Sequence, residues 1–180
     1  MKKKALLCAV AVVLVLCCAI GGTLAWLTAK TDPVTNTFTV GDISIELKET
    51  TSDYKMVPGN TIAKDPKVTV KAGSEACWLF VKVEKSANLD RFISYTIAES
   101  WTALTGADGV YYREVDASAA KAGMTYSVLA NDSVTVKDTV TKADMNGLTA
   151  ETYPTLTFTA YAVQKDNIAD AATAWAKTGN

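Results

Sequence analysis

The sequence predicts an all-β protein, a jelly-roll-like antiparallel β-sandwich that ends in a short C-terminal helix. About seven to nine short segments alternate polar with apolar residues, and turn signals separate them roughly every ten to fifteen residues. The segment Thr155–Gln164 alternates most strictly, as a strand with one face on a core does. Beyond it, between Ile168 and Ala176, the spacing of apolar residues becomes helical.

The chain begins with the three parts of an export signal. Lys2–Lys4 form a basic start, an apolar run follows from Ala5 to Ile20, and small residues come next. Thr23 at position −3 and Ala25 at position −1 predict cleavage after Ala25, so that Trp26 begins the mature chain. Residues 1–25 are therefore interpreted as a signal peptide, and the protein as secreted to the extracellular matrix or the cell surface.

Two alternatives stay open at this end of the chain. Cleavage after Ala29 is the second choice. The stretch Ala5–Leu27 is also long enough to cross about 30 Å of hydrocarbon as an uncleaved anchor. Both place the remaining chain outside the cell, because positive charge stays on the cytoplasmic side.

The exported part carries a mildly acidic balance. Removal of residues 1–25 leaves 155 of the 180 residues and takes three lysines, so that 15 basic residues remain against 19 acidic ones. A surface of this kind, without a basic block, argues against nucleic acid as a partner.

The first strands of the exported part follow the cleavage point closely. Thr35–Val40 and Ile43–Leu47 both alternate polar with apolar residues, and Phe38 and Val40 share one face. We interpret residues 26–40 as a separate N-terminal segment and residues 41–180 as a single β-sandwich domain.

The centre of the sheet is predicted at Cys77–Glu84, whose first half is apolar throughout. Such a run is typical of a strand that is covered on both faces. The other three cysteines lie in the leader, so the exported chain cannot form an intramolecular disulfide, and Cys77 is interpreted as a small buried residue. The Pro-Gly pair in Val57–Asn60 predicts a turn.

The remaining elements are shorter. Further strands are expected at Val68–Val70, Tyr95–Ile97, Val110–Val115, Tyr126–Leu129 and Ser133–Val140, and helical turns or loops at Asn88–Ser94 and Ala117–Gly123. At the C-terminus, Ile168, Ala172 and Trp175 recur at helical spacing. Asp166 or Asn167 can cap this helix, which we expect to pack against the sheet.

The residue types also exclude most catalytic chemistry. The chain contains no histidine, which removes H-E-x-x-H zinc sites, Ser-His-Asp triads and Cys-His dyads. No glycine-rich phosphate loop or calcium loop is present, and the carboxylates are scattered. We therefore expect no enzyme, no metal and no cofactor. Tyr111 and Tyr112 leave open a glycan-binding face, although one face of their strand has to pack in the core.

Several segments resemble the TasA/camelysin family, exported Gram-positive proteins that a SipW-type signal peptidase processes. The resemblance rests first on Gly21-Gly22-Thr23 with Ala25 before the cut, and on NTFTVG followed by ISIEL. A second matching segment is Pro58-Gly59-Asn60 followed by Lys64-Asp65-Pro66. The run AYAVQ with the AATAWA helix after it resembles the end of the clostridial-type members.

This resemblance implies a jelly-roll sandwich that assembles into extracellular fibres of the biofilm matrix. In such fibres the segment after the cut leaves its own domain and completes the sheet of the next subunit. Here that role falls to Trp26–Val40, with Trp26, Leu27, Phe38 and Val40 as assembly residues. The implied partners are other copies of the chain, the SipW-type signal peptidase and an accessory matrix protein. The alternative is that Phe38 and Val40 pack in their own domain.

Two further functions stay open. Camelysin-type members have been classed as metallopeptidases, but a zinc peptidase without histidine would need an all-oxygen ligand set. The third hypothesis is a cell-surface adhesin or glycan-binding module that remains monomeric.

Overall fold

The computed structural model describes residues 3–4, 10–11, 41–51 and 54–179. The chain divides into two compact units, residues 1–38 and 39–180. In the first unit the described residues are helical, and every described strand belongs to the second. The residues predicted for cleavage and assembly lie outside the described residues: Thr23, Ala25, Trp26, Leu27, Phe38 and Val40.

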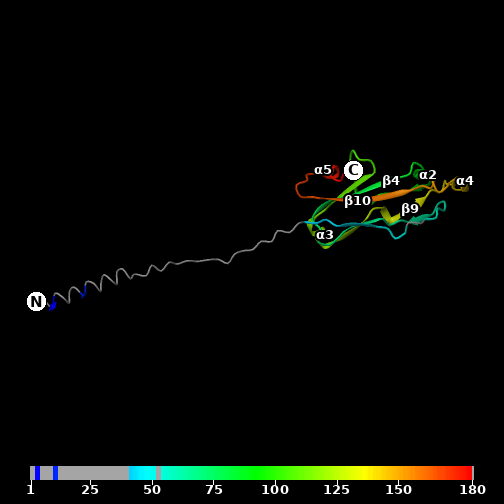
Figure 1. Cartoon of the computed structure of the whole chain (residues 1–180). Helices are drawn as coiled ribbons and strands as arrows, with labels where there is room; N and C mark the ends of the chain where they lie inside the picture. The colour runs from blue at the N-terminus through cyan, green and yellow to red at the C-terminus, as the bar shows by residue number, and fades with distance from the viewer. Residues whose placement is uncertain (1–2, 5–9, 12–40, 52–53, 180) are drawn as a thin grey trace. The chain divides into compact units, whose positions relative to one another are not determined.

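One layer of the second unit is a four-stranded antiparallel sheet in the order β10-β4-β7-β6. Its strands are β4 (Cys77–Lys85), β6 (Thr102–Ala103), β7 (Val110–Val115) and β10 (Leu156–Gln164). β4 pairs with β10 along its whole length and with β7 on its other side (Figure 1). The first five residues of β4 are buried, which confirms the predicted central strand.

The second layer consists of two three-stranded sheets that continue each other. The first has the order β1-β3-β8 and the second β2-β9-β5. Their strands are β1 (Ile45–Lys48), β2 (Thr61–Ala63), β3 (Lys67–Val70), β5 (Ile93–Ser94), β8 (Met124–Ser127) and β9 (Ser133–Val136). β2 leads into β3 and β8 into β9, and backbone hydrogen bonds from Lys64 to Asp132 (2.8 Å) and from Val128 to Pro66 (2.9 Å) join the two sheets.

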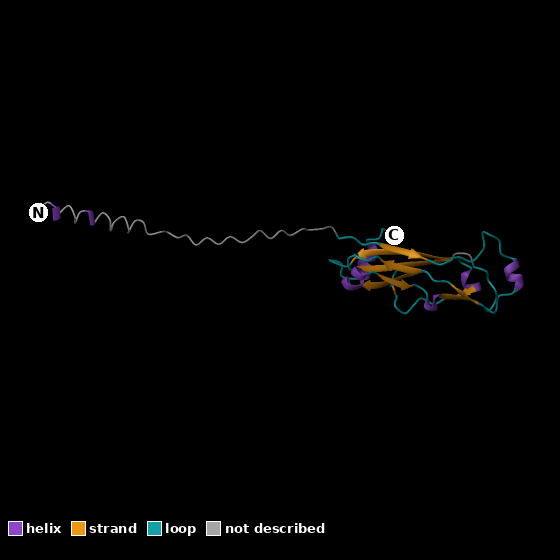
Figure 2. Cartoon of the chain, turned by 90° about the horizontal axis from the view of Figure 1, so that it is seen from below, coloured by secondary structure: helices purple, strands orange, loops and turns teal. Residues whose placement is uncertain are grey.

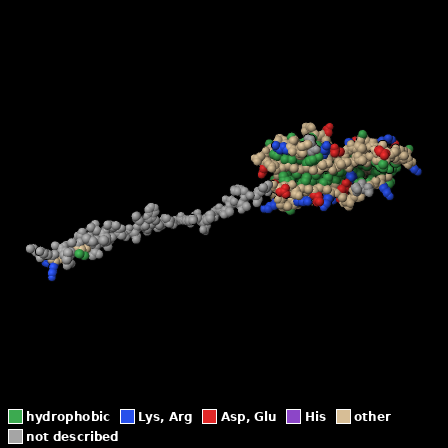
Figure 3. All heavy atoms as spheres, viewed as in Figure 1, with side chains coloured by type: hydrophobic (Ala, Val, Ile, Leu, Met, Phe, Trp, Pro, Cys, Tyr) green, Lys and Arg blue, Asp and Glu red, His purple; other side chains and the backbone are tan. Residues whose placement is uncertain are grey.

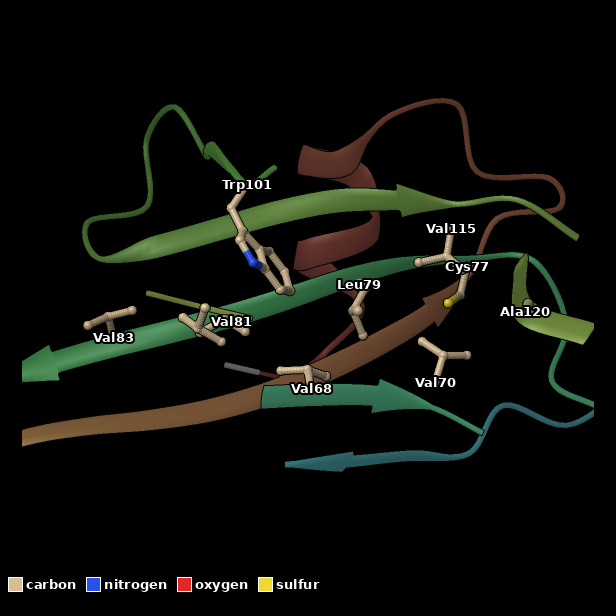
Figure 4. Packing of buried hydrophobic residues seen from close by; sticks show 10 residues of the cluster. Val68, Val70, Cys77, Leu79, Val81, Val83, Trp101, Val115 and Ala120 are labelled. Carbon is tan, nitrogen blue, oxygen red and sulfur yellow. The ribbon is translucent and has the colours of Figure 1, made fainter. Parts of the chain in front are cut away.

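Apolar side chains from both layers fill the space between them (Figure 4). Alternate residues of β3 and β4 contribute most of this core, as the period-two pattern of packed strands requires. The buried residues are Val68, Val70, Cys77, Leu79, Val81, Val83, Trp101, Val115, Ala120 and Val128. Cys77 is buried with a free thiol, as predicted, and burial raises the pKa of that thiol to about 11.

The outer face of β4 is covered by the C-terminal helix, α5 (Ala171–Ala176). Trp175 lies with its ring centroid 5.3 Å from that of Phe80 and 5.2 Å from that of Tyr161. These aromatic contacts attach the helix to β4 and β10, which confirms that it packs against the sheet.

The start of this helix differs from the prediction. Its N-cap is Asp170, whose carboxylate accepts a hydrogen bond from the backbone N–H of Thr173 at 2.7 Å. Asn167, one of the two expected caps, has a φ of 62°, a left-handed conformation that a helix does not continue through. The buried residues of this region are Ile168, Ala171 and Ala174, so the predicted position Ala172 lies on the exposed side.

The other elements follow the prediction with shifted bounds. The helices α2 (Leu89–Phe92) and α3 (Ala117–Ala122) occupy the two expected helical turns, and Figure 2 shows short helices at both ends of the sandwich. β5 lies earlier than the expected edge strand, with Ile97 reduced to an isolated bridge. The helix α4 (Lys142–Asn146), β2 and β6 were not predicted. The predicted class, an antiparallel β-sandwich with a short C-terminal helix, is confirmed.

Candidate functional site

The unpaired strand edges of the sandwich are the candidate functional site. β10 is the last strand of its layer, and it pairs only with β4 in the part of the chain that the structure describes. Backbone hydrogen bonds from Lys165 to Ala76 (2.9 Å) and from Ser86 to Thr155 (3.0 Å) flank this ladder. In an antiparallel pair the bonded residues alternate, so the odd-numbered residues of β10 bond to β4.

The even-numbered residues of β10 therefore turn their backbone N–H and C=O groups away from β4. These residues are Leu156, Phe158, Ala160, Ala162 and Gln164. The first four also direct their side chains at the core between the layers. Apart from Gln164 at its end, the open edge thus belongs to residues whose side chains are apolar.

β1 repeats this arrangement at the edge of the other layer. It pairs only with β3 among the described residues, and the backbone N–H of Lys71 donates to the carbonyl of Ser44 at 2.8 Å. The register then leaves the backbone groups of Ile43, Ile45 and Leu47 facing outward. Their side chains pack against the same core as those of β10.

We call the space between these two edges the open seam. Seven apolar residues line it, and all are only partly buried: Ile43, Ile45, Leu47, Leu156, Phe158, Ala160 and Ala162. β1 and β10 are in contact across the layers, and Figure 3 shows a band of hydrophobic side chains between them on the face in view. At one end lies a depression of about 480 Å³, lined by Ile43, Ala162 and Ile168 among others.

An ion pair between a buried lysine and a partly exposed glutamate closes the other end of the open seam. The Lys64 ammonium is 2.7 Å from the Glu49 carboxylate and lies over the rings of Tyr54 (4.7 Å) and Phe158 (5.5 Å). Lys64 is 8% exposed. Burial and the hydrogen bond to Glu49 raise the pKa of Tyr54. These contacts hold the loop after β1 against β10.

Asp65 fixes the same loop from its outer side. Its carboxylate accepts hydrogen bonds from the backbone N–H of Thr50 (3.0 Å) and from the Thr50 hydroxyl (2.6 Å), and these bonds lower the pKa of Asp65. The segment Lys64-Asp65-Pro66, noted in the sequence for its resemblance, therefore anchors this end of the seam.

The opposite margin of the sandwich, which we call the closed seam, is covered by Trp101, Arg113 and Tyr126. The Trp101 indole N–H donates to the carbonyl of Ser127 at 2.8 Å, an outward-facing backbone group at the edge of β8. The Arg113 guanidinium lies 3.6 Å from the ring centroid of Tyr126 and 5.7 Å from that of Trp101. Burial lowers the pKa of Arg113, and its Nε has no hydrogen-bond partner among the residues that the structure describes.

Other chemistry is limited in the described part of the chain. There, no group of three or more acidic or cysteine side chains is placed to hold a metal ion. Among the same residues, no helix has the length and apolar character needed to span a bilayer. Comparison of the chain with protein-family models, with curated proteins and with solved structures finds no match.

Proposed function

We propose that the protein is an exported structural subunit that assembles through its N-terminal segment, with residues 35–40 of one copy pairing in the open seam of the next. One observation carries the proposal: two strand edges that no described strand pairs with border one incompletely buried apolar surface. Long unpaired edges are templates for an added strand, and soluble proteins usually block them.

The alternation of the segment matches the alternation of the edge. Asn36, Phe38 and Val40 share one side of an extended strand, and threonines occupy the other. A strand that pairs with β10 directs every second side chain between the layers. Phe38 and Val40 then cover the apolar side chains of β1 and β10, and the threonines face solvent.

Assembly of this kind produces filaments. The donated segment precedes the sandwich in the chain, whereas the accepting seam belongs to the next copy, so each subunit offers two different surfaces. Such head-to-tail contacts extend without limit unless the rotation between copies closes a ring. Cleavage after Ala25 is then the trigger, because the leader otherwise ties the segment to the membrane.

A proline in the outward-facing edge tests this proposal directly. Ala160→Pro removes a backbone N–H that β4 does not use, whereas a proline at Thr159 would remove a β4 ladder bond. We expect the chain beginning at Trp26 to form filaments in electron micrographs, with rising light scattering, and Ala160→Pro to remain monomeric and folded.

The matched control is Thr125→Pro, which places a proline in an outward-facing position of β8 at the closed seam. This variant should still form filaments. A chain that begins at Gly41 should remain monomeric and should act as an acceptor for an added peptide of residues 35–40. Filaments from Ala160→Pro equal to those of the parent chain would refute assembly at β10.

A further inference from the structure

A shallow depression lies between the layers near β5 and β7, on the margin away from the open seam. Its volume is about 560 Å³, within the range of small-molecule sites. Its polar lining consists of two lysines, one carboxylate, two tyrosines and two hydroxyl side chains: Lys85, Asp90, Ser94, Tyr95, Thr96, Tyr111 and Lys137. Neither the predicted assembly nor the packing of the core accounts for this combination.

The two tyrosines reach the depression from different layers. Tyr95 follows β5, and Tyr111 belongs to β7. Both are partly buried and pack against the core, so their rings are held in place while part of each remains accessible. Burial also raises the pKa of Tyr95. Its hydroxyl, like that of any tyrosine, is protonated at neutral pH and able to donate a hydrogen bond.

The charges of the depression do not balance. The Lys85 ammonium pairs with the Asp90 carboxylate at 2.5 Å. The Lys137 ammonium donates instead to the backbone carbonyl of Asp90, and it forms no ion pair with a carboxylate of the described residues. The depression therefore carries one uncompensated positive charge at Lys137.

We infer that this depression binds an acidic saccharide, a pyranose unit that carries a carboxylate, with Tyr95 and Tyr111 against the sugar ring and Lys137 paired with the carboxylate. Partly exposed aromatic rings have an apolar body that suits the C–H face of a sugar, and their hydroxyls bond to its polar edge. Ser94 and Thr96 add further hydroxyl groups.

The charge of the site separates this ligand from its rivals. A neutral sugar leaves Lys137 without a counter-charge. A nucleic acid strand requires a groove of cations that follows its phosphates. This depression has two lysines, and one of them, Lys85, is already paired with Asp90. The inference is independent of the proposed assembly, because none of its residues lines the open seam.

Calorimetry on the protein as recovered from the medium of an expressing host tests the site, with polygalacturonate as the acidic glycan and dextran as the neutral one. We expect binding to polygalacturonate alone. Lys137→Gln and Tyr111→Leu should each weaken it roughly tenfold or more. The control variants are Lys48→Gln and Tyr153→Leu, which change an exposed lysine and an exposed tyrosine elsewhere and should leave binding unchanged.

Three results would overturn the inference: no binding of polygalacturonate at millimolar sugar, equal loss of affinity in Lys48→Gln and Lys137→Gln, or equally tight binding of dextran sulfate that Tyr111→Leu leaves intact. Binding of dextran sulfate that does not depend on Tyr111 would mean that the protein attracts any polyanion by charge alone. If Tyr111→Leu fails to fold, the affinity of Lys137→Gln decides the outcome, because among the described residues the Lys137 ammonium bonds to one backbone carbonyl and to no side chain.

Discussion

The two margins of the sandwich differ in how the edges of their outer strands are covered. At the closed seam, the Trp101 indole covers the edge of β8 by donating a hydrogen bond to the carbonyl of Ser127. The Arg113 guanidinium lies against the rings of Tyr126 and Trp101. At the open seam, β1 and β10 end their layers, and no described strand or indole covers the outward backbone groups of Leu156 to Gln164.

Among the described residues, the closed seam has an indole over its strand edge, whereas the open seam has no such cover. An exposed strand edge can pair with other chains and lead to aggregation, and proteins usually block such edges. Here a buried tryptophan blocks the edge of β8. The open edge is also the longer one, with nine residues in β10 against four in β8. A donated strand gains more hydrogen bonds there.

Truncation of one aromatic residue at each seam should produce the largest loss in the free energy of unfolding. Trp101 is 6% exposed and belongs to the core, so Trp101→Ala should lower the free energy of unfolding by about 3–5 kcal/mol. Phe158 is only partly buried, and Phe158→Ala should cost about 2 kcal/mol. Urea denaturation followed by tryptophan fluorescence and by circular dichroism measures both.

These measurements belong in the Ala160→Pro background, where assembly cannot add stability to either variant. The same background shows whether the closed seam matters for solubility, because Trp101→Ala frees the carbonyl of Ser127. Equal losses for the two truncations would contradict the distinction between a closed and an open margin.

Removal of the ion pair between Glu49 and Lys64, at the end of the open seam, should cause an intermediate loss in the free energy of unfolding. Glu49→Ala leaves the ammonium of Lys64 buried without a carboxylate, and we expect a loss of about 1–3 kcal/mol. Lys64→Met should cost less, because the side chain of Glu49 is 24% exposed and water can reach it. The order of the two urea midpoints is the observable, and a larger loss for Lys64→Met would show that the lysine stem, rather than the charge, holds the loop.

Much of the sandwich follows from local pattern, whereas its edges do not. Cys77–Glu84 and Thr155–Gln164 alternate or remain apolar over enough residues for their type and their burial to be predicted. β2 and β6 have three and two residues, too few for any periodicity. Which strand lies at an edge depends on pairing between distant segments, and no window of the sequence contains that information.

The same limit applies to the candidate sites. The family resemblance of the sequence implies a donating segment, Trp26–Val40, and its residues Phe38 and Val40 lie outside the described part of the chain. It does not predict the accepting edge of β10. The sequence does not predict that Trp101 covers the edge of β8, because Trp101 lies in an irregular segment. Its hydrogen-bond acceptor, the carbonyl of Ser127, is 26 residues away in the chain.

Acid should weaken the open seam through Asp65. Hydrogen bonds from Thr50 lower the pKa of Asp65 in the folded protein below its ordinary value. The carboxylate therefore contributes stability that is fully present above the unfolded pKa and is lost as the pH falls through the lower, folded pKa. We expect a urea midpoint that is nearly constant between about pH 5 and 7 and that declines below about pH 4.

Asp65→Asn should flatten part of this decline. The variant to compare is Asp170→Asn, since the pKa of Asp170 is lowered in the same way by its hydrogen bond from Thr173 at the start of α5. A decline that both variants leave unchanged would assign the acid sensitivity to other carboxylates.

The smallest change in the free energy of unfolding is expected at Arg113, a partly buried cation in the closed seam. Its charge is half-buried, and among the described residues no carboxylate pairs with it and its Nε has no hydrogen-bond partner. The guanidinium contacts the rings of Tyr126 and Trp101 instead. A cation over aromatic rings gains about 0.5–2 kcal/mol, and the cost of removing the guanidinium from water opposes this gain. Arg113→Met keeps the stem volume and removes both terms, so its free energy of unfolding should change by less than about 1 kcal/mol. A loss close to that of Trp101→Ala would show that the guanidinium itself, and not the indole beside it, closes this margin of the sandwich.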